Sequence, residues 1–309
     1  MWRTICISVL ATLAAWTPAA YADGEYGKIE KTIEHGGQER EYILYEPENL
    51  PANAPLLFVL HGRGQTNQGF YELGFNDLAD KNGFAVAYPQ STYAYFGGKD
   101  QNDPEAFKLF EWNAHNDPTR VDDVDFLSHL ARFLQSEHAL NPDRTFVAGF
   151  SNGGYMSYTL ACQASETFKG VAIVAALMDN KVYENCSPPP KAMPVLHIHG
   201  TDDFACPIGG NIDKKTGAKI PPSVAEIIEL WAKRNNCTTT ETLKITDTTT
   251  AHFHRDGING NEVHYYEISG GEHLWPGEVP KKEIQEKQGY GDNSGIDATK
   301  IIWDFFSKY

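Results

Sequence analysis

Short apolar runs, separated by polar segments that contain glycine and proline, recur along most of the chain. Each run is nearly continuous in hydrophobicity rather than alternating between apolar and polar positions. Such runs, bounded by turn residues, predict strands, and continuous hydrophobicity predicts strands covered on both faces of a sheet. The predicted strands are Glu41 to Tyr45, Leu56 to Leu60, Ala85 to Tyr88, Thr145 to Phe150, Val171 to Ala176, Val195 to His199 and Val263 to Ile268.

Helical periodicity occupies several of the segments between these strands. Asp123 to Glu137 places its apolar residues on one helical stripe, Val224 to Trp231 does the same, and Ala298 to Tyr309 forms a closing helix. Because strand and helix alternate, the pattern predicts an α/β fold with a mostly parallel central sheet and helices on both faces. The threonine-rich stretch Thr238 to Thr250 fits either an edge strand or a loop. No repeat or linker interrupts the pattern, so we expect a single domain over residues 23–309.

The first 22 residues have the features of a secretory signal. Arg3 provides a positive start, Ile5 to Trp16 is a short apolar stretch, and Ala20-Tyr21-Ala22 is a small-x-small cleavage site. The apolar stretch is too short to cross a bilayer, and Pro18 disfavours the alternative of a buried N-terminal helix. We therefore expect a free exported protein, either extracellular or periplasmic, that begins after Ala22.

The charge of the chain is strongly acidic, with a formal net charge of -15 at pH 7. Such a surface repels phosphate backbones and anionic lipids, so neither nucleic acid nor a membrane is an expected partner. Solubility outside the cell is sufficient to explain the charge.

Four cysteines remain after the predicted cleavage, and an even number in an exported protein indicates disulfides. Three connectivities are possible. We expect each cysteine to pair with its neighbour in the sequence, Cys162 with Cys186 and Cys206 with Cys237. The spacings are not those of a zinc site.

A serine between two glycines stands where a predicted strand gives way to a helix, in Gly149-Phe150-Ser151-Asn152-Gly153. In this context Gly-x-Ser-x-Gly is a nucleophile elbow, a strained turn that exposes the serine hydroxyl. Side chains at Gly149 and Gly153 would collide with the neighbouring strand and helix. The helix N-terminus behind Ser151 offers positive dipole density to a developing oxyanion.

A serine hydroxyl needs a base to take its proton and an acid to orient that base. Two adjacent carboxylates, Asp202 and Asp203, follow the predicted Val195 strand, and His273 follows the Val263 strand after two glycines. The order Ser151, acid, His273 is that of α/β-hydrolases. The order of the residues alone leaves the choice between Asp202 and Asp203 open.

The loop after the predicted Leu56 strand, His61-Gly62-Arg63-Gly64, fits the loop that supplies the second oxyanion donor in this fold. We assign the two donors to the backbone N–H groups of Arg63 and Asn152. His61 is then interpreted as a buried residue that holds the loop by hydrogen bonds.

Taken together, these residues resemble the secreted esterase family that contains polyhydroxybutyrate depolymerases and feruloyl or acetylxylan esterases. The matching motifs are Leu60-His61-Gly62, Gly149-Phe150-Ser151-Asn152-Gly153-Gly154, His199-Gly200-Thr201 followed by Asp203, Trp231 with Cys237, and His273-Leu274-Trp275-Pro276-Gly277. The resemblance spans from about Arg40 to the C-terminal helix. It implies the α/β-hydrolase fold, and it selects Asp203 over Asp202 because the acid stands two residues after the threonine.

Two positions depart from the family pattern. The family usually continues after Asp203 with a Val-Pro-Tyr-like step, whereas this chain has Ala205-Cys206-Pro207-Ile208. Arg63 stands where a small residue or cysteine is frequent. Both positions are expected near the pocket, so the resemblance carries the chemistry more safely than the substrate.

Aromatic side chains near these motifs are candidates for binding an aromatic ring or a sugar face. Trp275, two residues after His273, is the strongest candidate, and Trp112, Tyr93, Tyr95 and Phe96 are further ones for which plain packing is the preferred interpretation. The pairs His197/His199 and His252/His254 have strand spacing but no third ligand in the pattern, so no metal site is expected.

The sequence therefore predicts a serine-dependent carboxylic ester hydrolase that needs no cofactor. A feruloyl or acetylxylan esterase acting on plant cell-wall polysaccharide is the preferred interpretation, and a polyhydroxybutyrate depolymerase, acting on a polyester, is the alternative. A secreted binding module that has kept the fold but lost turnover is the rival from another class. Its mark would be a missing triad residue.

Overall fold

The computed structural model describes residues 26–97, 102–186, 191–213, 215–217, 219–220, 222–277 and 291–309. The predicted signal segment, residues 1–22, lies outside the described residues. No helix within these ranges is long and apolar enough to cross a membrane.

The described residues form a central ten-stranded sheet, with the order β1-β2-β4-β3-β7-β8-β9-β14-β13-β12. The run from β4 through β3, β7, β8 and β9 to β14 is parallel, and antiparallel strands extend it at both ends. The parallel strands are β3 (Leu56–Leu60), β4 (Ala85–Pro89), β7 (Thr145–Phe150), β8 (Gly170–Val174), β9 (Val195–Gly200) and β14 (Val263–Ile268). The flanking strands are β1 (Gly27–His35), β2 (Gln38–Glu46), β12 (Thr239–Lys244) and β13 (Thr249–Arg255).

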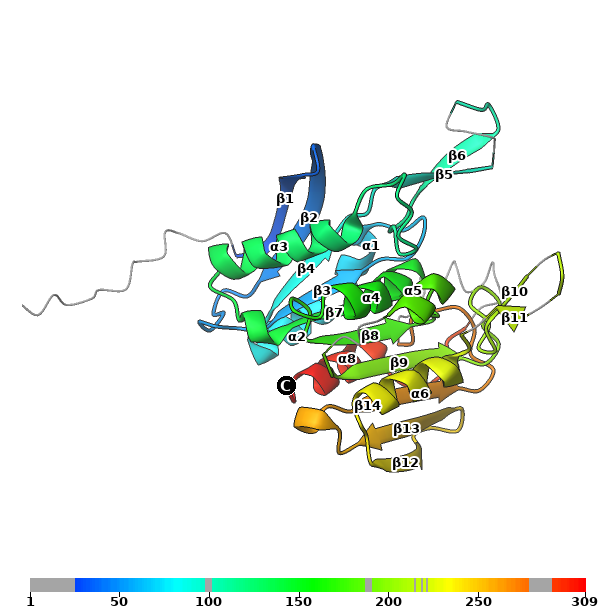
Figure 1. The fold of residues 1–309 in the computed structure, drawn as a ribbon. Helices are drawn as coiled ribbons and strands as arrows, with labels where there is room; N and C mark the ends of the chain where they lie inside the picture. Colours follow the sequence, from blue (N-terminus) through cyan, green and yellow to red (C-terminus); the bar gives the residue numbers. More distant parts are fainter. Residues whose placement is uncertain are drawn as a thin grey trace, which may run out of the picture.

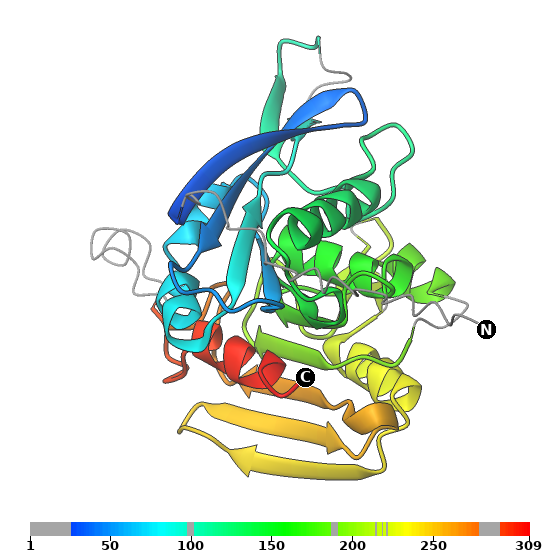
Figure 2. The same ribbon diagram turned by 90° about the vertical axis from the view of Figure 1, so that its left-hand side faces the viewer.

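Helices lie on both sides of this sheet (Figure 2). One face packs against α3 (Asp123–Glu137), α4 (Asn152–Gln163), α5 (Asn180–Asn185) and α6 (Val224–Arg234). The other face packs against α1 (Asn67–Tyr71), α2 (Phe75–Asn82) and α8 (Ala298–Phe306). Alternate residues of β3 divide between the two cores: Phe58 belongs to the first, and Leu57 and Val59 to the second. The predicted α/β-hydrolase architecture, with a mostly parallel sheet covered on both sides, is confirmed.

The predicted strands and helices all form, with shifts of a few residues at their ends. The helix starts follow from local chemistry. Asp122 caps α3 by accepting a hydrogen bond from Asp125 N–H at 2.9 Å, and Ser223 and Glu226 form a capping box at α6. The Thr238 to Thr250 stretch, which fits strand or loop by sequence, contains β12 and the start of β13.

Two small hairpins extend from the side of the molecule at which the carboxyl ends of the parallel strands lie (Figure 1). One consists of β5 (Tyr93–Gly97) and β6 (Ala106–Phe110), the other of β10 (Asn211–Ile212) and β11 (Lys219–Ile220). The loops that follow parallel strands gather at the carboxyl ends of those strands. The hairpins therefore flank the region where the predicted catalytic residues lie.

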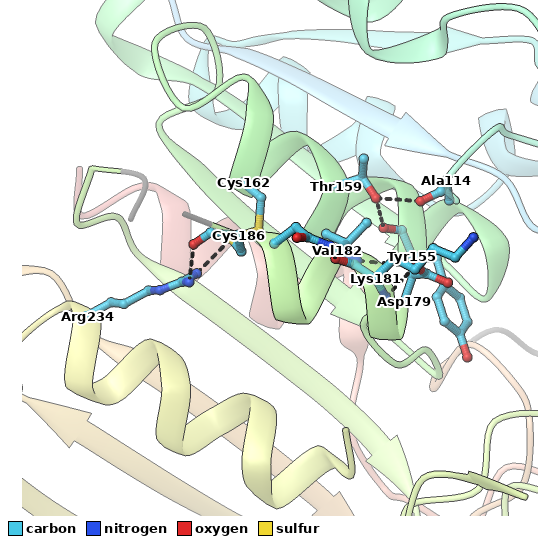
Figure 3. The surroundings of a disulfide bond; sticks show 10 residues. Ala114, Tyr155, Thr159, Cys162, Asp179, Lys181, Val182, Cys186 and Arg234 are labelled. Carbon is cyan, nitrogen blue, oxygen red and sulfur yellow. Dashed lines mark hydrogen bonds between the residues drawn. A yellow bond between two sulfur atoms is a disulfide. The ribbon is translucent and has the colours of Figure 1, made fainter. Parts of the chain in front are cut away.

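A disulfide joins Cys162, in the last turn of α4, to Cys186, which follows α5 (Figure 3). Arg234 donates to the carbonyl oxygen of Cys186 at 2.6 Å and so links α6 to this bond. The predicted pairing of these two cysteines is confirmed.

The expected bond between Cys206 and Cys237 is wrong, because both cysteines are free thiols. The segment that contains Cys206 lies beside the start of α6 in space, because Val224 N–H bonds to Ile208 O, whereas Cys237 follows the end of that helix. A helix of this length separates its ends by roughly 16 Å, whereas a disulfide needs Cα atoms within about 7 Å.

Candidate active site

Ser151 occupies the turn between β7 and α4 with a strained backbone, at φ 50° and ψ −120°. A non-glycine residue at positive φ is uncommon and tends to mark a functional site. The turn leaves no room for side chains at its glycines. A Cβ on Gly149 would lie 2.1 Å from the Gly153 carbonyl oxygen, and one on Gly153 would lie 2.3 Å from the Leu60 carbonyl oxygen. The predicted collisions with helix and strand are confirmed.

Three of the predicted residues lie in one hydrogen-bonded line. His273 Nε2 is 2.9 Å from Ser151 Oγ, and His273 Nδ1 is 2.8 Å from Asp203 Oδ2. Since a carboxylate accepts, Nδ1 carries the proton and donates a hydrogen bond to Asp203, which leaves Nε2 to accept a hydrogen bond from the serine hydroxyl. Asp203 is buried, whereas Asp202 is exposed. Asp203 is therefore the carboxylate that orients the histidine.

The loops that carry Asp203 and His273 pack directly against each other. A Cβ on Gly200 would lie 2.1 Å from the Gly271 carbonyl oxygen, and Asp202 N–H donates to that same oxygen at 2.9 Å. The second oxygen of Asp203, Oδ1, accepts from the N–H groups of Ala205 and Cys206, at 2.9 and 2.7 Å. The carboxylate is thereby held on both sides, and its orientation toward His273 is fixed.

A buried chain of rings continues from Asp203 into the core. Tyr158 Oη lies 2.7 Å from His197 Nδ1, His197 Nε2 lies 3.0 Å from His199 Nδ1, and His199 Nε2 lies 2.7 Å from the Cys206 carbonyl oxygen. Burial lowers the pKa of both histidines, so they are neutral.

The protons of this chain follow by elimination. A carbonyl only accepts, so His199 Nε2 donates, His199 Nδ1 accepts from His197 Nε2, and His197 Nδ1 accepts from Tyr158. His199 Nε2 is also 3.5 Å from Asp203 Oδ2. Each donor in this chain therefore points toward the loop that carries Asp203. All four ring nitrogens of His197 and His199 take part in these hydrogen bonds.

The loop after β3 lies against the elbow, because a Cβ on Gly62 would be 3.3 Å from Ser151 Cβ. Gly62 N–H donates to Gln65 Oε1 at 3.0 Å and Gly64 N–H donates to Phe110 O at 2.8 Å. Within the described residues no hydrogen bond is found for the N–H groups of Arg63 or Asn152, the two predicted oxyanion donors. Asn152 begins α4, where an N–H has no partner inside the helix.

His61 is buried below this loop and makes three hydrogen bonds, as its structural interpretation requires. Its Nδ1 donates to the Gly62 carbonyl oxygen at 2.8 Å, and its Nε2 accepts from Gln90 Nε2 at 2.9 Å and from Ser91 N–H at 3.2 Å. Burial lowers the pKa of His61 to about 4. Protonation would also place a new N–H against two donors.

The two tryptophans named as candidates for binding substrate are both buried, at 0% exposure for Trp112 and 3% for Trp275, so neither presents its ring to the surface. Trp275 packs between the rings of Phe70 and Phe75 and donates its indole N–H to Thr299 Oγ1. Trp112 donates its indole N–H to His61 O at 3.0 Å. Its backbone N–H and carbonyl also bond the Asn152 side chain. Trp112 therefore supports both proposed oxyanion donors without facing substrate.

A pocket of about 360 Å³ opens beside Ser151. Its lining includes several residues that the sequence analysis did not single out: His115, Tyr155, Asp179, Asn180 and Asn211. Two of these lining residues are hydrogen-bonded to each other, with His115 Nδ1 2.8 Å from Asp179 Oδ2. The position of Tyr155, one helical turn after Ser151, is a usable signal in the sequence. The others come from loops without a motif.

One cluster among the described residues has ligand atoms close enough for a metal ion: Asp203, Cys206 and His273, within 4.8 Å of one another. Two of these groups are bonded to each other in the line to Ser151, and burial raises the pKa of the Cys206 thiol to about 12. Metal ligation needs a deprotonated thiolate, whereas the Cys206 thiol keeps its proton. The cluster therefore suits proton transfer better than metal binding.

A strained serine between strand and helix, followed by an acid and a histidine at later strand ends, defines an α/β-hydrolase site. Residues 46–216, more than half of the chain, match the phospholipase/carboxylesterase family. The chain belongs to this family.

Individual relatives agree with this placement. The chain is 31% identical to poly(3-hydroxyalkanoate) depolymerase C of Paucimonas lemoignei over 44% of this chain and 31% of that protein. It is 25% identical to feruloyl esterase C of Emericella nidulans over 69% of this chain and 74% of that protein. The solved acetyl xylan esterase from Aspergillus awamori superposes with a TM-score of 0.58, covers 85% of this chain and 100% of its own, and is 16% identical, which shows the shared fold. The chain spans 57%, 31% and 22% of the length of three curated relatives that it matches.

Proposed function

We propose that the protein is a serine-dependent carboxylic ester hydrolase. The observation that carries this proposal is the line from Ser151 Oγ through His273 to Asp203, with 2.9 and 2.8 Å contacts. Ser151 Oγ attacks the ester carbonyl carbon while His273 Nε2 takes its proton, and the resulting imidazolium donates to Asp203. His273 then returns the proton to the leaving alcohol. Water, activated by the same histidine, hydrolyses the acyl-serine and releases the acid.

The negative charge that develops on the carbonyl oxygen needs donors placed in advance. The N–H groups of Arg63 and Asn152 fill this role in the proposal. The immobilised loop below Arg63 and the helix start at Asn152 support it, since both donors would then need no rearrangement during the reaction.

Hydrolysis of p-nitrophenyl acetate tests this assignment. We expect turnover by the wild-type protein and a loss of about four orders of magnitude or more in kcat for Ser151→Ala. Ser269→Ala, an exposed serine outside the site, serves as the matched control. Wild-type turnover by Ser151→Ala would refute the proposal.

For the substrate, we propose an ester of plant cell-wall polysaccharide, of the feruloyl or acetylxylan kind. The similarity to feruloyl esterase C supports this choice. The similarity to a poly(3-hydroxyalkanoate) depolymerase favours a polyester as the second candidate. Turnover of methyl ferulate, acetylated xylan and a hydroxybutyrate oligomer separates the two.

The rival function, a binding module without turnover, predicts an inert serine. Covalent labelling of Ser151 by an organophosphate distinguishes the two, because only an activated serine reacts. We expect labelling of the wild-type protein at Ser151 and none of His273→Ala.

We propose further that the protein is exported and that cleavage follows Ala22. The bond between Cys162 and Cys186 supports an oxidising compartment. Sequencing the N-terminus of the protein recovered outside the cytoplasm tests this, and we expect a chain that starts at Asp23.

A further inference from the structure

A second and larger cavity, of about 1020 Å³, adjoins the pocket beside Ser151. We call it the hairpin groove. It lies between the start of β2 (Gln38 to Glu41), the segment Gln90 to Phe96 with Phe110 and Glu111, and the loop from Asn113 to Val121. Arg63 and His115 line both cavities, so the two are neighbours. A substrate whose ester carbonyl reaches Ser151 can therefore extend into the groove.

The β5–β6 hairpin, located in Figure 1, contributes the aromatic residues Tyr93, Tyr95, Phe96 and Phe110 to the lining of the groove. Tyr93 is 45% exposed and Tyr95 is 53% exposed, although both belong to a strand. Tyr93 stacks on Phe110 at 4.1 Å, and the Lys108 ammonium lies 4.2 Å from the centre of its ring. No ring contact within the described part of the chain is found for Tyr95. Tyr95 therefore offers the least covered aromatic face in the groove.

The polar part of the groove is built on a buried carboxylate. Glu111 is 4% exposed and binds two guanidinium groups, with Arg63 Nε at 2.6 Å and an Arg120 nitrogen at 2.7 Å. Arg120 also donates to the Glu111 carbonyl oxygen at 2.6 Å. These contacts fix planar hydrogen-bonding groups in place while Arg63 remains about half exposed.

This combination discriminates between the two candidate substrates. Sugar hydroxyls both donate and accept, and the apolar face of a sugar ring packs on an aromatic side chain, so a carbohydrate can satisfy both parts of the groove. A polyester has acceptors but no donors, so it can bond the Arg63 guanidinium but offers no hydrogen bond to the exposed carboxylates of Glu39 and Glu41, which also line the groove and only accept.

We propose that the hairpin groove is a binding subsite for the oligosaccharide chain that carries the scissile ester, with Tyr95 as its stacking platform. This inference rests on the proposed esterase function, because it assumes that the ester reacts at Ser151. It adds where the polymer lies and which residues hold it.

Kinetics on a small and a large substrate test the proposal. We expect Tyr95→Ala to raise KM for an acetylated xylo-oligosaccharide about tenfold, the effect of losing one stacking contact. Its kcat/KM on p-nitrophenyl acetate stays within about twofold of wild type, because that ester is too small to reach the groove. Tyr95→Phe, which keeps the ring, retains the wild-type KM. Phe107→Ala is the matched control: Phe107 belongs to the same hairpin and is 54% exposed but does not line the groove.

The possible outcomes distinguish failure of the esterase proposal from failure of the groove proposal. Absence of p-nitrophenyl acetate hydrolysis by the wild-type protein refutes the esterase proposal itself. If that activity is present and Tyr95→Ala leaves the KM for the oligosaccharide unchanged, the groove proposal is overturned. It is equally overturned if Phe107→Ala raises this KM as much as Tyr95→Ala, or if Tyr95→Ala impairs only a hydroxybutyrate oligomer.

Discussion

The backbone of Gly153 approaches Gly149 so closely that a Cβ on Gly149 would lie 2.1 Å from the Gly153 carbonyl oxygen and 2.7 Å from Ser157 Oγ. The first of these neighbours is backbone at the start of α4, so it cannot move without moving the helix that follows Ser151. Gly149 is not among the glycines with positive φ. The turn therefore requires glycine at this position because a Cβ has no room there, and not because of the backbone angle.

We therefore predict that Gly149→Ala lowers the free energy of unfolding by at least about 3 kcal/mol and removes activity in whatever protein remains folded. Urea denaturation and p-nitrophenyl acetate hydrolysis measure the two effects. Gly69→Ala in α1 is the control, because its added Cβ would meet only Thr66 Oγ1, at an ordinary 3.9 Å. Equal stability of the two variants would show that the elbow can relax.

The sequence predicts the centre of this fold well and its periphery poorly, for a physical reason. Strands such as β3 and β7 are buried on both faces, so their hydrophobicity is continuous and readable. Every residue of β12 is exposed, and β5 and β6 form a hairpin apart from the central sheet. These three strands therefore lack the continuous apolar run by which the central strands are predicted. The hairpin groove is hidden from the sequence for the same reason as the hairpin that borders it.

The site shows the same division. Ser151, Asp203 and His273 stand in motifs whose glycines are required by contacts between backbones, which makes them visible in one sequence. The roles of Trp112 and Trp275 depend on which way each ring points, and proximity to a motif does not determine this. Whether Cys206 pairs with Cys237 likewise depends on the spatial arrangement, because the two cysteines lie at opposite ends of α6 and a single sequence does not show this.

The buried chain from Tyr158 to His199 predicts a stability effect. Tyr158→Phe removes the donor to His197 Nδ1 and leaves that nitrogen buried without a partner. We expect the free energy of unfolding to fall by about 1 to 3 kcal/mol. Tyr26→Phe, at a tyrosine that is 51% exposed, should change it by less than about 0.5 kcal/mol. Chemical denaturation of both variants checks this, and an unchanged Tyr158→Phe protein would argue against the assigned proton positions.

The disulfide assignment predicts a thiol count. A chain that begins at Asp23 should release two titratable thiols when unfolded without reductant, Cys206 and Cys237. Replacing Cys162 and Cys186 together by alanine should lower the free energy of unfolding by about 3 kcal/mol, because the bond closes a loop with a sequence separation of 24. Ellman titration in denaturant gives the count. A count of zero would mean that Cys206 and Cys237 are paired after all.

His61 predicts how stability depends on pH. Its pKa is about 4 in the folded protein, against an ordinary histidine value of 6.5, so between these values the unfolded chain binds more protons than the folded one. Stability contributed by neutral His61 is therefore present above pH 6.5 and is lost as the pH falls toward 4. From pH 7 to pH 5 this single group should lower the free energy of unfolding by about 2 kcal/mol. Urea denaturation at the two pH values measures the change, and His61→Gln, which cannot titrate, should show a correspondingly smaller loss. A wild-type stability that stays constant over this interval would contradict the buried, neutral state assigned to His61.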